Sequence, residues 1–111
     1  MSFWAATRVQ PRRERVAQFF LEQAGFEVYL PKIRERRIRK GKRVETLLPL
    51  FPSYMFLRIE LQWREARRCP RVIKVVASAE SGAPIPVPDE IVDVIRSRER
   101  DGALELPKRK L

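Results

Sequence analysis

The alternation of apolar and polar residues is most regular over Tyr54–Leu61, and it predicts a strand with two different faces. The face expected to point into the core carries four apolar residues, Met55, Leu57, Ile59 and Leu61. The other face begins with two large rings and ends with two charges, in the order Tyr54, Phe56, Arg58 and Glu60. We expect this second face to be partly exposed.

Four further strands are predicted. Phe3–Val9, Glu27–Arg39 and Val72–Ala77, the last of these being the final strand, are indicated by their β-branched and aromatic residues, and Val44–Leu48 leads from the basic hairpin to the 49–56 segment. Pro31 lies inside the second one, which indicates an edge strand or a bulge. The basic run Arg39–Arg43 has Gly41 at its centre and predicts the tip of a hairpin.

Helical spacing is clearest over Arg12–Ala24, and Gly25 follows as a C-terminal cap. The apolar stripe expected there consists of Val16, Phe19, Phe20, Gln23 and Ala24, widened by Ala17 and Leu21. A short helix is predicted over Gln62–Arg68. A second long helix begins at Pro88, with two acids in its first turn and a buried stripe of Ile91, Val94 and Ile95.

The order of these elements predicts an α+β fold, an α/β sandwich in which a central antiparallel sheet of about four strands is flanked by helices. The 111 residues suit one compact domain, which we place at residues 1–98. Residues 99–111 are strongly charged and are expected to form a tail or linker. Residues 78–88, rich in proline and glycine, are expected to form a loop.

The net charge is +10, from 24 Lys and Arg against 14 Asp and Glu, and it is typical of a protein with a nucleic-acid partner. A soluble domain with excess arginine is the alternative. Basic residues gather before the first helix, in the 32–43 hairpin, which holds eight of them and one acid, and around residues 64–74. Trp4 is suited either to the core or to stacking on a base.

Residues typical of enzyme active sites are few. The chain has one cysteine and no histidine, so a disulfide within the chain and a histidine-containing metal site are excluded. The four glycines are scattered and form no phosphate-binding loop. Cys69 lies between Arg68 and Arg71, which would lower the pKa of an exposed thiol, but a small apolar residue near a helix end is the simpler interpretation. We therefore expect no enzymatic activity, cofactor or metal.

The longest apolar stretches are too short to cross a bilayer, and residues 1–9 lack the pattern of a signal peptide. These observations predict a cytoplasmic protein with no membrane contact, and we expect a monomer.

The segment Pro49-Leu50-Phe51-Pro52-Ser53-Tyr54-Met55-Phe56 combines three aromatic residues with two prolines. One interpretation is a core strand with a stiff entry. The other is an aromatic patch for a protein partner, because interfaces favour Tyr and Phe as anchors. Spacing alone does not choose between them.

This segment occurs in a wider pattern that resembles the N-terminal (NGN) domain of NusG-family transcription elongation factors. The pattern runs from about Phe3 to Ile95: Trp4 in a first strand, Leu21-Glu22-Gln23-Ala24-Gly25-Phe26-Glu27-Val28, Leu30-Pro31, the 49–56 segment, Pro70-Arg71-Val72 and Gly82-Ala83-Pro84-Ile85-Pro86-Val87-Pro88. The basic hairpin beside the 49–56 segment looks closer to the specialised, RfaH-like branch. Arg8 and Arg71 depart from the family, which commonly has a non-basic residue and a glycine there.

The resemblance implies a factor that rides on RNA polymerase, bridges its cleft and raises processivity. A depression would take the clamp helices of the largest subunit, and it would draw on six residues: Phe51, Pro52, Tyr54, Phe56, Ile91 and Ile95. Other surfaces would approach the opposite lobe of the polymerase. The non-template or upstream DNA would be faced by Arg8, Arg12, Arg13, Arg15 and Arg71, together with Lys74.

Family members usually carry a C-terminal KOW barrel, and none is expected within these residues. A free-standing module that binds single-stranded DNA or RNA is the alternative function, and an enzyme using Cys69 is a third.

Overall fold

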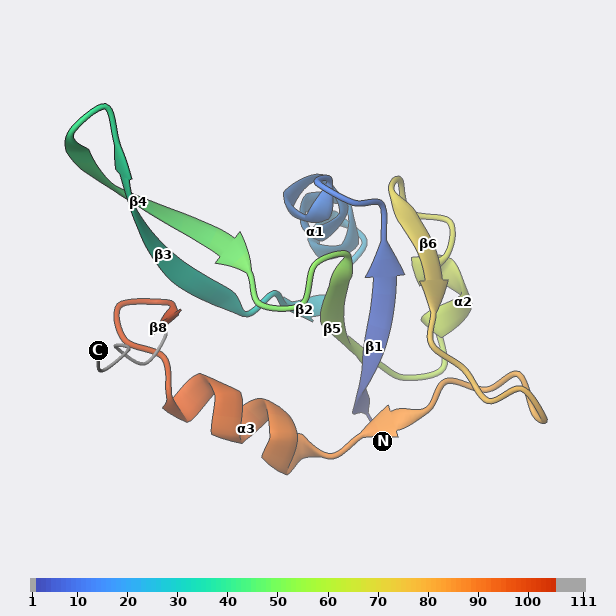
Figure 1. Ribbon diagram of the computed structural model, residues 1–111. Coiled ribbons are helices and arrows are strands. Elements are labelled where there is room, and N and C mark those ends of the chain that lie inside the picture. The colour runs from blue at the N-terminus through green and yellow to red at the C-terminus, as the bar shows by residue number, and fades with distance from the viewer. Residues whose placement is uncertain (1, 106–111) are drawn as a thin grey trace.

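The computed structural model describes residues 2–105. Its main element is an antiparallel sheet in which β2, β5, β1 and β6 lie in that order and β7 pairs with β1 (Figure 1). The strands are β1 (Phe3–Val9), β2 (Glu27–Tyr29), β5 (Tyr54–Ile59), β6 (Val72–Val75) and β7 (Pro86–Val87). The helices that flank the sheet are α1 (Glu14–Gln23), α2 (Trp63–Ala66) and α3 (Asp89–Ser97). The predicted α+β sandwich with a central antiparallel sheet is confirmed.

Each face of this sheet carries its own hydrophobic cluster. Alternate residues of β1 and β5, such as Ala5 and Leu57, pack with Leu21 of α1 and Ala66 of α2. The opposite face holds a smaller cluster built from Trp4, Tyr29, Phe56 and Val92, the last of which belongs to α3. The helices therefore lie on both faces of the sheet, with α3 alone on the second face.

The predicted faces of strand β5 are largely confirmed. Met55, Leu57 and Ile59 are buried in the larger cluster, as expected. Leu61 was also expected there, but this prediction is wrong, because β5 ends at Ile59 and the Leu61 side chain is 98% exposed. On the second face, Phe56 is only 8% exposed because α3 covers that part of the sheet.

Helix α1 ends as predicted but buries only the Ala17 and Leu21 side of the predicted stripe, together with Glu14. Gly25 has a φ of +94°, and the amides of Gly25 and Phe26 bond to the carbonyls of Glu22 and Leu21, which is the Schellman arrangement. The buried residues are Glu14, Ala17 and Leu21. Val16, Phe19 and Phe20 were expected in the core, yet they are exposed. The small Ala17 faces the sheet and lets the helix approach it closely.

Helix α3 begins near Pro88 as predicted, but only Ile95 of its predicted buried stripe packs against the sheet. Val92 is fully buried and Ile95 packs beside it, whereas Ile91 and Val94 are about half exposed. Polar contacts add to this packing. The Tyr29 hydroxyl donates to Glu99 just after the helix, and Arg58 of β5 pairs with Asp89 at 2.9 Å. The Arg96 guanidinium lies over the rings of Tyr29 and Trp4, at 4.5 and 5.2 Å.

Residues 27–39 form two strands rather than the predicted single one. The chain breaks at Leu30-Pro31, and β3 (Lys32–Arg39) pairs with β4 (Lys42–Pro49) in a second, separate sheet. Leu30 and Pro31 are both buried, so the break is fixed by packing. The β3–β4 ribbon, which we call the arm, projects away from the main sheet (Figure 1). The predicted hairpin tip at Gly41 is confirmed.

The expected boundary at residue 98 does not coincide with the end of regular structure. Strand β8 (Leu104–Glu105) pairs in parallel with β3, and Ala103 is fully buried. Arg34 holds this segment by donating to the carbonyls of Arg100 and Asp101, both at 3.2 Å. Residues 106–111 of the expected tail lie outside the described residues. Likewise Val72–Ala77 is not the last strand, since β7 and β8 follow it.

Candidate functional site

The 49–56 segment forms a tight turn that enters strand β5. The Tyr54 amide donates to the Phe51 carbonyl at 3.0 Å, and Ser53 has a φ of +71°. Proline at the second position and a positive φ at the third are the signature of a type II turn. The turn therefore fixes how Phe51 and Tyr54 leave the backbone.

Three neighbouring segments hold this turn in place. The Ser53 amide donates to the buried carboxylate of Glu14, at the start of α1, over 3.1 Å. The Ser53 carbonyl accepts from the Val9 amide at 2.8 Å. The Leu50 amide donates to the Pro31 carbonyl, also at 2.8 Å. Both sides of the turn are thus bonded to β1, to α1 and to the break before the arm.

An apolar hollow of about 260 Å³ lies beside the turn, on the part of the second sheet face next to the α3 cluster. It is lined by Ala6, Phe51, Tyr54, Met55 and Phe56. The β1–β5 register pairs Ala6 with Phe56, which leaves room because alanine is small. The rings of Phe51 and Phe56 meet edge to face, with centroids 6.1 Å apart. A hollow of this kind can accept an apolar side chain.

The six residues expected around the depression fall into two groups. Phe51, Tyr54 and Phe56 line the hollow, and exposed Pro52 adjoins them within the turn. Ile95 instead packs against the smaller hydrophobic cluster, and Ile91 is 48% exposed on α3. Neither isoleucine lines the hollow. Ala6 was missed, because its place there depends on strand register.

The six basic residues expected to meet nucleic acid are all exposed and come from three segments that adjoin at one end of the sheet. Arg8 at the end of β1 is paired in register with Lys74 of β6 and with Tyr54 of β5. The Gln10 amide donates to the Arg71 carbonyl at 2.9 Å, which joins the β1–α1 loop to the start of β6. Within residues 2–105, none of the six forms an ion pair; they are Arg8, Arg12, Arg13, Arg15, Arg71 and Lys74.

Two of these arginines have an unusual backbone. Arg12 has a φ of +64° and Arg71 a φ of +71°, in the left-handed region that glycine and asparagine favour. The conformation costs about 1 kcal/mol for an ordinary side chain. The Arg71 guanidinium donates to the Gln10 side-chain oxygen at 3.1 Å. Strained residues persist where the surrounding structure fixes them, and they cluster at functional sites.

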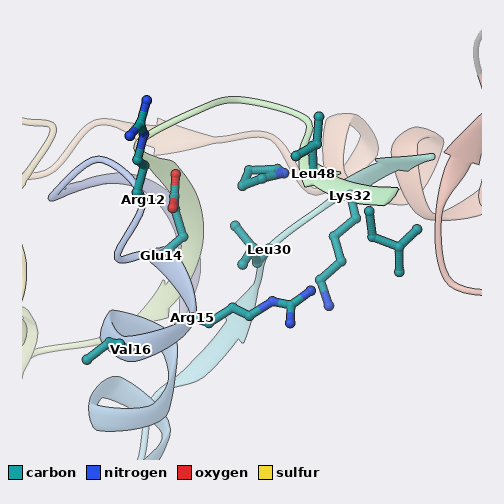
Figure 2. Close-up of a pocket in the computed structure, with 9 residues that line it drawn as sticks. Arg12, Glu14, Arg15, Val16, Leu30, Lys32 and Leu48 are labelled. Carbon is teal, nitrogen blue, oxygen red and sulfur yellow. The ribbon is translucent and has the colours of Figure 1, made fainter. Parts of the chain in front are cut away.

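A second hollow, of about 180 Å³, separates the start of α1 from the base of the arm (Figure 2). Its apolar wall is formed by Val16, Leu30, Leu47, Leu48 and Pro49. Arg12, Arg15 and Lys32 supply cations to its rim, and Arg15 and Lys32 extend toward each other (Figure 2). Lys32 was not among the predicted contact residues, and the fold brings it beside the predicted Arg15.

Cys69 has the properties of a structural residue. Its thiol is half-buried against the larger hydrophobic cluster. Burial raises the pKa of the Cys69 thiol, and the neighbouring Glu65 adds to this rise. The lowering of the pKa that Arg68 and Arg71 would cause at an exposed thiol does not occur, so the reactive thiolate is disfavoured, as the simpler interpretation of Cys69 predicts.

Within residues 2–105, no cluster of three or more Cys, Asp or Glu side chains is arranged to hold a metal ion. No helix in the described part of the chain combines the length and the apolar character needed to cross a bilayer.

Comparison with known proteins gives a family, a relative and a solved structure to which the chain is similar. The family model described as "Transcription termination factor nusG" matches residues 2–96. The transcription termination/antitermination protein NusG of Yersinia pestis is 29% identical over 92 residues, covering 80% of this chain and 50% of that protein. A solved structure described as "Domain interaction in Thermotoga maritima NusG" has a TM-score of 0.49 and 20% identity, covering 81% of this chain and 52% of that chain. The chain thus spans about half the length of these relatives. Because the family model covers most of its residues, the chain belongs to the NusG family of transcription factors.

Proposed function

We propose that this chain binds RNA polymerase by docking its apolar hollow on the clamp helices of the largest subunit. The observation that carries the proposal is the hollow formed by Phe51, Tyr54 and Phe56, which stays open beside the cluster that α3 covers. Apolar anchors that enter such a hollow contribute most of the energy of a protein interface. Bound there, the domain would bridge the polymerase cleft and raise processivity. The match to NusG-family proteins supports this assignment.

The basic end of the sheet would meet DNA while the hollow holds the polymerase. Arg8 is the register neighbour of Tyr54, which lines the hollow, so the two surfaces adjoin. Six exposed cations there can bind the phosphates of the non-template strand or of the upstream duplex. The strained backbone of Arg12 and Arg71 supports a contact that depends on the position of these side chains. The role we propose is binding without catalysis.

The decisive variants are Phe51→Ala and Tyr54→Ala, made singly and together. Phe56 is left intact because it also packs with Trp4 and Val92, and its truncation would disturb the fold. Phe19→Ala is the matched control, since this aromatic side chain is 57% exposed on α1 and does not line the hollow. Circular dichroism verifies that each variant is folded.

We expect the double variant to bind core RNA polymerase at least about 30-fold more weakly in biolayer interferometry, since each ring is worth about 1–2 kcal/mol at an interface. The Phe19→Ala control should bind like the parent chain. Equal binding by the parent and the double variant would disprove the site, and no binding by the parent would disprove the function. Tight, strongly salt-dependent binding to single strands without polymerase would instead favour the free-standing module.

A further inference from the structure

The arm ends in a basic tip that belongs neither to the polymerase hollow nor to the basic end of the sheet. β3 and β4 pair continuously from Lys32↔Pro49 to Arg39↔Lys42, so each strand extends about 27 Å. No residue of the arm belongs to either hydrophobic cluster. The ribbon projects from the body of the molecule with its tip in solvent (Figure 1). Such an extended ribbon can reach a partner that lies apart from the rest of the domain.

The charges of the arm differ between its base and its tip. Arg34 pairs with Glu45 and Glu105, Arg36 pairs with Glu105, and Arg37 pairs with Glu35. The tip consists of Arg39, Lys40, Gly41, Lys42 and Arg43. In the described part of the chain, its four cations form no ion pair. The three arginines at positions 34, 36 and 37 are thus paired with carboxylates, whereas the tip presents positive charge that no carboxylate of the described residues neutralises.

The turn at the tip has a lysine at a position where a less stable backbone conformation is required. Lys40 and Gly41 have φ values of +50° and +73°, as a two-residue type I′ turn requires. Asparagine or glycine is the usual first residue of this turn, because other side chains lose about 1 kcal/mol in the left-handed region. Lys40 is therefore unfavourable for the stability of the turn, but it adds a fourth cation at the outermost point of the arm.

The register distributes the tip cations over both faces of the ribbon. Residues paired across two antiparallel strands project to the same face, so Arg39 and Lys42 share one face. Arg43 and Ile38 share the opposite face, where Ile38 is 75% exposed. A ribbon that carries cations on both faces can reach phosphates on both walls of a groove, and an exposed isoleucine can contact a thymine methyl group.

We propose that the arm tip enters the major groove of duplex DNA. The major groove of B-form DNA is about 12 Å wide and admits a two-stranded ribbon, whereas the deep, narrow major groove of A-form RNA does not. Arg39, Lys40, Lys42 and Arg43 bind the phosphates on either side. This contact is separate from the polymerase hollow and from the basic end of the sheet.

The test measures binding of the whole chain to a 20-base-pair DNA duplex by fluorescence anisotropy, at several salt concentrations. The tip variant carries Arg39→Gln, Lys42→Gln and Arg43→Gln. A matched control removes equal charge beside α2, through Arg64→Gln, Arg67→Gln and Arg68→Gln. A second control, with Arg39→Lys, Lys42→Arg and Arg43→Lys, retains the charge of the tip.

We expect the tip variant to bind duplex DNA at least about 10-fold more weakly, and the slope of log affinity against log salt to fall by about 2 to 3. The α2 control should lose less than about threefold, and the charge-retaining variant should bind like the parent. Duplex RNA and single-stranded DNA should bind more weakly than duplex DNA. Methyl green, which occupies the major groove, should compete, whereas the minor-groove ligand netropsin should not.

Binding by the tip variant within about twofold of the parent would overturn the proposal, as would an equal loss in the α2 control. Equal binding of duplex RNA or single strands, or competition by netropsin alone, would overturn the assignment to the major groove. Failure here is distinguishable from failure of the polymerase proposal, because the tip variant retains the hollow and should bind core polymerase normally.

Discussion

At the scale of single residues, Thr7 is the clearest departure from ideal packing. Its side chain is fully buried on the face of β1 that packs against the larger hydrophobic cluster. Within the described residues, its hydroxyl oxygen has no hydrogen-bond partner. A buried hydroxyl without a partner costs about 1–3 kcal/mol. We expect Thr7→Val, which has nearly the same shape, to raise the free energy of unfolding by about 1 kcal/mol in urea denaturation.

Thr7→Ser is the control for this prediction. It keeps the hydroxyl and removes only a methyl group, so it should lower the free energy of unfolding. A Thr7→Val variant less stable than the parent would show that the hydroxyl is satisfied in solution.

Most of the hollow could be predicted residue by residue. The alternation along β5 separates Met55 and Leu57 from Tyr54 and Phe56, and the 49–56 motif adds Phe51. Ala6 could not be predicted, since only the register of β1 against β5 places it opposite Phe56. The left-handed backbone of Arg71 could not be predicted from arginine itself, which rarely adopts it, although the glycine common at this position in the family is compatible with it.

At the scale of elements, both long helices were predicted, but their buried faces were predicted only in part: Ala17, Leu21 and Ile95 pack as expected, whereas the other apolar residues of the predicted stripes are exposed. Each helix carries more apolar residues than its contact with the sheet requires, so periodicity supports several stripes at once. On α1 the small Ala17 is buried and the larger Phe19 is exposed, and on α3 Val92 is buried and Ile91 is exposed. Which residues are buried depends on how closely each helix approaches the sheet. The sequence of the helix alone does not determine that distance.

The attachment of α3 gives a prediction about alkaline pH. Burial raises the pKa of the Tyr29 phenol above its ordinary value of about 10, and its hydrogen bond to Glu99 raises it further. Below about pH 10 the phenol is neutral in both the folded and unfolded chains, so its contribution to stability is complete. Above that pH the unfolded chain releases the proton first, and the contribution falls as pH rises.

We therefore expect the free energy of unfolding of the parent to fall more steeply between about pH 9 and 11 than that of Tyr29→Phe. At neutral pH the variant should be about 1 kcal/mol less stable, because it lacks the bond to Glu99. Contributions from groups that the two proteins share cancel in the comparison. Parallel pH profiles for the two proteins would contradict the raised pKa.

At the scale of the whole molecule, the separation of the arm from the body was the main feature that the sequence did not reveal. Pro31 indicated a bulge or an edge, and the structure has a complete break between two sheets. The partner that completes the second sheet is β8, about 70 residues further along the chain, and its sequence reads as a charged tail. Strands that pair over so large a separation in sequence leave no signal in the local pattern of apolar and polar residues.

This division predicts that the arm can be shortened without loss of the fold. Replacing residues 37–44 by Asn-Gly would join Arg36 to Glu45, which are register partners, through a favoured two-residue turn. The contacts of Arg34 with the β8 segment remain, and both hydrophobic clusters are untouched. We expect the free energy of unfolding to change by less than about 1 kcal/mol, with a single cooperative transition.

The matched control is Val92→Ala, which removes a fully buried side chain from the smaller hydrophobic cluster and should cost roughly 2 kcal/mol. If the shortened chain loses as much stability as this control, the arm is part of the cooperative unit. If it does not, the body folds independently of the arm. The length and charge of the arm can then be changed to test its binding to DNA while the fold and the polymerase hollow stay constant.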